Sequence, residues 1–272
     1  MAEGALTRTQ TVELLERHGL TLHKRYGQHF LVDPNIVRRI VRVLESPVGT
    51  PVLEVGAGIG TLTVALRDAG HPVVAYELDH RFEPALREVV GDRDRIELRF
   101  EDAAAREPDL RGTWAFTANL PYNVGTSILL DVIRNEAAVV EFVVMVQREV
   151  ADRLVASPGS RTYGVPSVVS QLSCDVSIEF TVPPHVFLPP PNVGSAVLRL
   201  ARHSPPSPLR NRAADLAAAA FGQRRKMLRS SLRSVLRDPE SVLSAAGLNP
   251  SARAEELAPD AFMALATQAG VE

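Results

Sequence analysis

The stretch Leu53-Glu54-Val55-Gly56-Ala57-Gly58-Ile59-Gly60 places three glycines directly after a short apolar run and before a predicted helix. Glycine permits a tight turn and lets a ligand approach the backbone closely, and the N-terminus of the following helix favours anionic groups. An acid, Glu77, ends the next apolar run. A carboxylate about 20 residues after such glycines can accept both hydroxyls of a ribose. The pattern therefore predicts a loop that binds an adenosine-containing cofactor at the end of a β-strand.

Short apolar, β-branched runs alternate with helical stretches on both sides of this loop. Five of these runs are predicted strands, at 51–55, 73–77, 96–100, 114–118 and 139–146. Strands that alternate with helices indicate βαβ units and a mainly parallel sheet, an α/β fold of the Rossmann-like type. Two later runs, 176–182 and 196–200, are expected to close the edge of the sheet as a hairpin around the proline-rich segment 183–191.

The two ends of the chain are predicted to be helical. Two short helices are expected between residues 9 and 43, around a loop at 24–31, and Asp33 before Pro34 is typical of a capped helix start. Three prolines within 203–208 indicate a linker. After it, helices are predicted at 211–236, 239–246 and 259–268. We therefore expect an α/β domain at 1–202 and a small helical domain at 203–272.

Composition excludes several classes of protein. The chain has 272 residues, 30 Lys+Arg against 32 Asp+Glu, and 45% hydrophobic residues, which is the composition of a folded globular protein. One cysteine, Cys174, allows neither an internal disulfide nor a multi-cysteine zinc site. No apolar run approaches the length of a membrane span, and the first ten residues lack the apolar core of a signal peptide. We expect a cytoplasmic protein that does not bind membranes.

The near-neutral total charge conceals a basic region. Residues 180–250 hold ten basic and three acidic side chains, which favours an anionic partner. Arg224, Arg225, Lys226 and Arg229 are expected to lie together at the start of a helix and to contact phosphates, although a merely solvated helix face is the alternative.

The segment Asn119-Leu120-Pro121-Tyr122-Asn123 follows the fourth predicted strand. Ligands of open parallel sheets bind at the carboxyl ends of the strands, so this loop should border the cofactor. Asn119 offers an amide and Tyr122 a stacking face, which together suit the exocyclic amine of a planar base. Asp102, after the third predicted strand, is placed to meet an adenine amino group. These residues alone do not separate NAD from S-adenosylmethionine.

Five blocks of the sequence resemble the ribosomal RNA adenine dimethyltransferases, and most closely the bacterial small-subunit branch of that family. They are an N-terminal signature, a cofactor loop, a catalytic motif, a late loop with its strand, and the start of a C-terminal helical domain. The blocks occupy residues 26–33, 52–61, 119–122, 187–197 and 220–229.

The resemblance implies an S-adenosylmethionine-dependent methyltransferase domain with a small C-terminal helical domain. It also implies dimethylation of N6 of two adjacent adenosines in the 3′-terminal hairpin of 16S rRNA, by a monomer, without a metal, in the immature small ribosomal subunit. Asn119 and Tyr122 would hold the target adenine, with Phe187 on its other face. The implied cofactor contacts are His29, Leu31, Gly56, Glu77, Asp102 and Asn119. His29 departs from the family, because many members have Asn there.

Three alternatives stay open at this point. The related 23S rRNA methyltransferases that confer macrolide resistance share the cofactor and catalytic motifs. A catalytically silent ribosome assembly factor could keep the same fold, although Glu77, Asp102 and Asn119 are intact. An NAD-dependent dehydrogenase would lack an evident proton relay and would leave the basic helical region unexplained.

Overall fold

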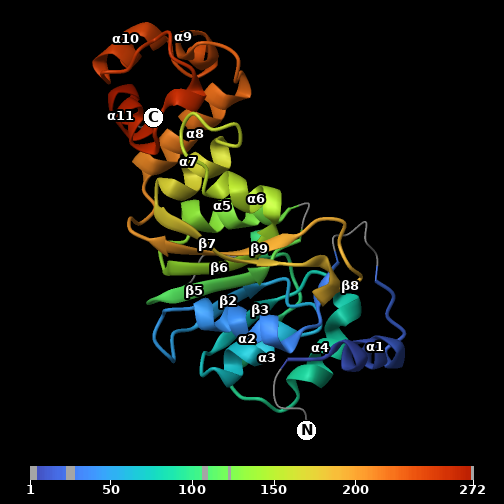
Figure 1. Ribbon diagram of the computed structural model, residues 1–272. Helices are drawn as coiled ribbons and strands as arrows, with labels where there is room; N and C mark the ends of the chain where they lie inside the picture. The colour runs from blue at the N-terminus through green and yellow to red at the C-terminus, as the bar shows by residue number, and fades with distance from the viewer. Residues whose placement is uncertain (1–4, 23–27, 106–109, 122–123, 271–272) are drawn as a thin grey trace. The chain divides into compact units, whose positions relative to one another are not determined.

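The computed structural model describes residues 5–22, 28–105, 110–121 and 124–270, and the chain forms two compact units (Figure 1). The first unit consists of residues 1–129, 138–151 and 177–201, and it holds most of the sheet. The second consists of residues 130–137, 152–176 and 202–272 and is mainly helical. The functional division into 1–202 and 203–272 stays a prediction.

A seven-stranded sheet with the order β4-β3-β2-β5-β6-β9-β7 forms the centre of the fold. The first five strands of that order are parallel to their neighbours, whereas β9 runs antiparallel to β6. The strands are β2 (Val52–Val55), β3 (Val73–Tyr76), β4 (Ile96–Arg99), β5 (Trp114–Asn119), β6 (Val139–Gln147), β7 (Cys174–Val182) and β9 (Ser195–Arg202). The predicted α/β class, the five parallel strands and the pairing of the last two runs at the sheet edge are confirmed.

Helices cover the sheet because its central strands are apolar on both faces. All four residues of β2 are buried, as expected for a strand inside a parallel sheet. Helices α2 (Pro34–Val43), α3 (Thr61–Asp68) and α4 (Glu83–Val90) lie side by side over one face of the sheet (Figure 1). Val37 and Leu66 from two of these helices join Val52 and Val143 from the strands in one buried core.

The N-terminal segment adds two helices and a short strand. Helix α1 (Arg8–Arg17) begins after Thr7, whose side chain caps it, and α2 begins after Asp33, whose carboxylate accepts the N–H groups of Asn35 and Ile36. The predicted capped start at Asp33 is therefore confirmed. Between these helices, β1 (Phe30–Leu31) pairs antiparallel with β8 (Phe187–Leu188), which joins segments distant in sequence.

The remaining helices are α5 (Gly125–Asn135), α6 (Arg148–Leu154), α7 (Val165–Gln171), α8 (Pro208–Gly222), α9 (Leu228–Ser231), α10 (Pro239–Ala245) and α11 (Pro259–Ala269). In the second unit, Tyr163, Leu216 and Phe262 belong to one buried core. Tyr163 also donates its hydroxyl hydrogen to the carbonyl of Leu257, at 2.8 Å. None of the helices in the described part of the chain is both long enough and apolar enough to cross a membrane.

The single long helix predicted at 211–236 is wrong. Helix α8 ends at Gly222, and the chain turns through 223–226 before α9 begins at Leu228. Met227 forms an isolated bridge with Arg253, which fixes an extended backbone at that point. Arg224 and Arg225 therefore lie in a turn rather than on a helix.

Candidate active site

The glycine loop leads from β2 into α3 and lies against the N-terminal strand. The N–H groups of Gly56 and Ala57 both donate to the carbonyl of Tyr76, at 2.8 and 3.0 Å. Gly58 has a φ of +59°, and a Cβ atom there would lie 2.6 Å from Cε1 of Phe30. Both the backbone conformation and the neighbouring ring thus exclude a side chain at Gly58.

Glu77 lies just beyond β3 and is held by the backbone of the glycine loop. Its Oε2 accepts the N–H of Gly58 at 2.7 Å, and its Oε1 accepts the N–H of Asp79 at 2.8 Å. Burial raises the pKa of Glu77, and the backbone N–H donors of Asp79 and Gly58 oppose that rise. Each carboxylate oxygen keeps a further lone pair, so the fixed carboxylate is suited to accept ribose hydroxyls.

A second buried acid, Glu54, lies on β2 beneath the same loop. Its side chain is 1% exposed, and burial together with the charge of the neighbouring Glu77 raises the pKa of Glu54 to about 8. Its Oε2 and the Oγ1 of Thr63 are both buried, and the Thr63 hydroxyl opposes part of this rise in the pKa of Glu54. Glu54 is not among the predicted site residues, although an acid inside an apolar strand is a visible signal in the sequence.

Asn119 ends β5, and its side-chain amide is tied to the N-terminal segment. The Nδ2 atom donates to the backbone carbonyl of His29 at 2.9 Å. The Nδ1 atom of His29 lies 2.7 Å from the carbonyl oxygen of Pro189. Because Nδ2 faces His29, the acceptor that Asn119 can offer to a substrate is Oδ1.

The pairing of β1 with β8 brings two of the predicted site segments together. Leu31 is the register partner of Phe187, and both side chains are buried. Residues 29 and 31, Phe187 and Asn119 therefore lie near the carboxyl ends of the parallel strands, where Gly56 and Glu77 also lie. This is the place at which open α/β sheets bind their ligands.

Comparison with known proteins identifies the family to which this arrangement belongs. A family model described as ribosomal RNA adenine dimethylase matches residues 19–269. The chain belongs to the ribosomal RNA adenine dimethylase family. A relative from Phenylobacterium zucineum is 44% identical over 259 residues, covering 93% of this chain and 90% of that protein. A relative from Streptococcus pneumoniae is 38% identical over 276 residues, covering 94% of each. Both are named ribosomal RNA small subunit methyltransferase A.

Solved structures agree with this membership. The 23S rRNA methyltransferase ErmE is 26% identical with a TM-score of 0.67, covering 88% of this chain and 99% of its own. A dimethyladenosine transferase from Plasmodium falciparum has a TM-score of 0.73 at 22% identity, covering 87% and 96%, and shows the likeness of fold. The family resemblance, the methyltransferase fold class and the assignment as an rRNA adenine dimethyltransferase are thus confirmed.

For three predicted site residues of this dimethylase, the structure does not test the predicted role. Asp102 is exposed in the loop after β4, two strands away from β2. Phe187 is completely buried in the core that contains Leu31. Tyr122 lies outside the described residues. The adenine-binding roles of these three side chains stay predictions.

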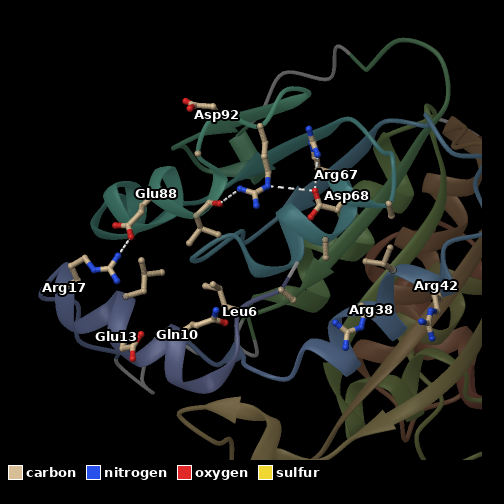
Figure 2. A pocket seen from close by; sticks show the side chains of 18 residues that line it. Leu6, Gln10, Glu13, Arg17, Arg38, Arg42, Arg67, Asp68, Glu88 and Asp92 are labelled. Carbon is tan, nitrogen blue, oxygen red and sulfur yellow. Dashed lines mark hydrogen bonds and ion pairs between the residues drawn. The ribbon is translucent and has the colours of Figure 1, made fainter. Parts of the chain in front are cut away.

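A separate hollow of about 1350 Å³ lies away from this site, among helices α1 to α4 (Figure 2). Its walls carry paired charges: Arg17 contacts Glu88, and Arg67 and Arg93 lie 3.1 and 3.9 Å from Asp68. Of the predicted cofactor and adenine contacts that the structure describes, none lines it. The hollow is therefore distinct from the site at the carboxyl ends of the strands.

Proposed function

We propose that this protein uses S-adenosylmethionine to dimethylate N6 of two adjacent adenosines in the 3′-terminal hairpin of 16S rRNA. In this proposal it acts as a monomer on the immature small ribosomal subunit in the cytoplasm. The observation that carries it is the position of Asn119, held by the backbone of His29 beside the glycine loop and Glu77. The small-subunit name of the relatives at 38–44% identity supports 16S rRNA over 23S rRNA as the substrate.

The residues around the glycine loop fit an adenosine-containing cofactor. Among the described residues, a Cβ atom at Gly56 would approach the Asn119 carbonyl and Pro121 at 3.8 and 4.0 Å, which is ordinary van der Waals contact. Beside the loop, Glu77 is fixed with lone pairs for the ribose hydroxyls. Gly56, Glu77, the backbone near His29 and Leu31, and Asp102 would hold the cofactor, and the bound group supplies a sulfonium methyl for in-line displacement.

Positioning is most of what the protein must supply to such a displacement. The adenine amine is a poor nucleophile because its lone pair is delocalised into the ring. Oδ1 of Asn119 and a neighbouring backbone carbonyl accept the two amine hydrogens, draw the nitrogen towards tetrahedral geometry and direct its lone pair at the methyl group. The Pro121 carbonyl already accepts the N–H of Gly125 at 2.8 Å, so we assign the second acceptor to Leu120.

The target base must leave its stack before it can enter the site, at a cost of a few kcal/mol that is smallest for a base in a loop. Tyr122 and Phe187 are the proposed stacking faces, which suits the positive charge that develops on the base. The nitrogen loses its proton readily once it is cationic, so no general base is required. The second methyl transfer to the same nitrogen requires that the adenine site also accepts the monomethylated amine.

Mapping the transferred methyl groups tests the substrate. Wild-type protein with S-adenosylmethionine labelled in its methyl group is expected to label two adjacent adenosines in 16S rRNA of immature small subunits. Particles that contain 23S rRNA serve as the control and should stay unlabelled. Labelling of 23S rRNA instead would establish the macrolide-resistance alternative, and no labelling of either would favour the silent assembly factor.

The turn between α8 and α9 distinguishes, among Arg224, Arg225, Lys226 and Arg229, the side chains that are available to bind RNA. Arg224 lies 2.7 Å from Glu255 and Arg229 lies 3.5 Å from Glu240, so both already have acidic partners. Arg225 and Lys226 are exposed, with no ion pair to another described residue. These two side chains are therefore the proposed phosphate contacts.

Replacing Arg225 and Lys226 with Gln is expected to flatten the plot of log affinity for the ribosomal particle against log salt concentration. Each lost phosphate contact lowers the slope by ~0.7–0.9. The double variant Arg225→Lys, Lys226→Arg keeps both charges and should retain the wild-type slope. An unchanged slope in the Gln variant would mean that the cluster is only a solvated surface.

A further inference from the structure

The N-terminal segment holds the backbone of the segment that carries Phe187 at several consecutive points. Nη2 of Arg8 donates to the backbone carbonyls of His185 and Phe187, at 2.6 and 3.0 Å. The N–H of Val32 donates to the carbonyl of Val186 at 2.9 Å. Nδ1 of His29 lies 2.7 Å from the carbonyl oxygen of Pro189.

His29 also contacts Asn119, through its backbone carbonyl. A carbonyl oxygen only accepts, so Nδ1 of His29 must carry the proton in its contact with Pro189. The backbone carbonyl of His29 likewise only accepts, and it takes a hydrogen from Nδ2 of Asn119. His29 is 9% exposed, so water competes little for either bond.

The hydrogen bond from Asn119 to the His29 carbonyl selects one orientation of the Asn119 amide. If the amide were flipped, Oδ1 would face the His29 carbonyl and two acceptors would be opposed. The unflipped amide keeps Oδ1 for a substrate, and a substrate amine needs an acceptor. His29 thus connects Asn119, which is proposed to polarise the amine, with the segment that carries Phe187, the proposed stacking ring.

We propose that His29 and Arg8 are positioning residues for the target adenine. In this proposal, which rests on the proposed function, they fix Asn119 and residues 185–189 relative to one another. Neither side chain needs to touch the base. The His29 side chain anchors Pro189 and so fixes the His29 carbonyl that orients Asn119, while Arg8 holds the other end of the same segment. Preorganised groups of this kind raise the rate because they need no rearrangement when the reaction occurs.

A matched pair of variants isolates the hydrogen bond of the His29 side chain. In His29→Asn, the Asn Nδ2 occupies the same place along the side chain as Nδ1 of His and keeps a donor for Pro189. In His29→Leu the shape is close to that of Asn, but there is no donor. We expect single-turnover methyl transfer, with cofactor and ribosomal particle saturating, to be about fivefold slower in His29→Leu than in His29→Asn, the scale of one hydrogen bond.

Two further readouts separate positioning from a structural or cofactor-binding effect. The affinity for S-adenosylmethionine, measured by calorimetry, should differ less than about twofold between the two His29 variants. In an Asn119→Ala background the fivefold difference should largely vanish, because the His29 carbonyl, whose position the side-chain bond to Pro189 fixes, then has no amide to orient. Equal rates for the two His29 variants, or a full difference that persists without Asn119, would overturn the proposal.

Arg8 provides an independent test, because it is exposed and its replacement is compatible with folding. Arg8→Met is expected to slow transfer about threefold, while Arg17→Met, on the same helix but paired with Glu88, serves as the control and should not. A wild-type rate in Arg8→Met would overturn the proposal even if His29→Leu does not fold. These outcomes are distinct from failure of the proposed function, in which the wild-type protein itself would not methylate the small subunit.

Discussion

Asn119→Ala is expected to slow methyl transfer ~10²-fold or more, the scale on which loss of one preorganised transition-state hydrogen bond acts in enzymes. The substitution removes the acceptor that polarises the adenine amine and breaks the bond to the His29 carbonyl. Binding of the ribosomal particle should change little, because phosphate contacts dominate that affinity. Single-turnover transfer with saturated enzyme separates the two effects.

The fold should survive this change, because Asn119 is the last residue of β5 and is only partly buried. A matched control is Asn135→Ala at the end of α5, where the side chain contacts Asp131 instead of the site. Thermal unfolding of both variants checks the fold. A folded Asn119→Ala protein that dimethylates at nearly the wild-type rate would contradict the proposed mechanism.

Glu77→Ala is expected to weaken the binding of S-adenosylmethionine at least tenfold. Loss of a hydrogen-bonding charged acceptor costs ~1.5–3 kcal/mol, and the N–H groups of Gly58 and Asp79 also lose their partner. Calorimetry measures the affinity directly. Glu97→Ala, an exposed acid on β4, is the matched control and should bind the cofactor as the wild type does.

The pH dependence of cofactor binding follows from the same carboxylate. Burial raises the pKa of Glu77, and the ionised form is the better acceptor for hydroxyl and N–H donors. Affinity should therefore fall as the pH falls through this raised pKa, and Glu77→Gln should remove that part of the dependence. Unchanged affinity in a folded Glu77→Ala protein would exclude the residue from the site.

The parallel strands could be predicted from the sequence because each is a short apolar run between loops. The run 139–146 differs by one residue from the observed β6. The end of α8 was missed because leucine and arginine continue past Gly222 in a helix-compatible pattern. The contacts that stabilise the turn include the bridge from Met227 to Arg253 and the ion pair from Arg224 to Glu255, whose partners are distant in sequence.

The individual site residues were easier to predict than their connections. Glu77 and Gly56 follow strands directly, so their place at the sheet edge comes from local pattern. The bond from Asn119 to the His29 carbonyl spans 90 residues and ends on a backbone atom, which carries no signature in the sequence. Glu54 is a different case, because an acid inside an apolar strand is visible in the sequence, whereas its proximity to Glu77 is not.

The pairing of β1 with β8 has a consequence for the order in which the protein is built during synthesis. The glycine loop, Tyr76 and Glu77 contact one another within one βαβ unit, so they can assemble soon after that unit leaves the ribosome. His29 must wait for Pro189, 160 residues later. Closing so long a loop is slow compared with local folding. The nascent chain therefore forms the contacts of the proposed cofactor loop well before those of the proposed adenine site, and a chain released before residue 189 would have the first without the second.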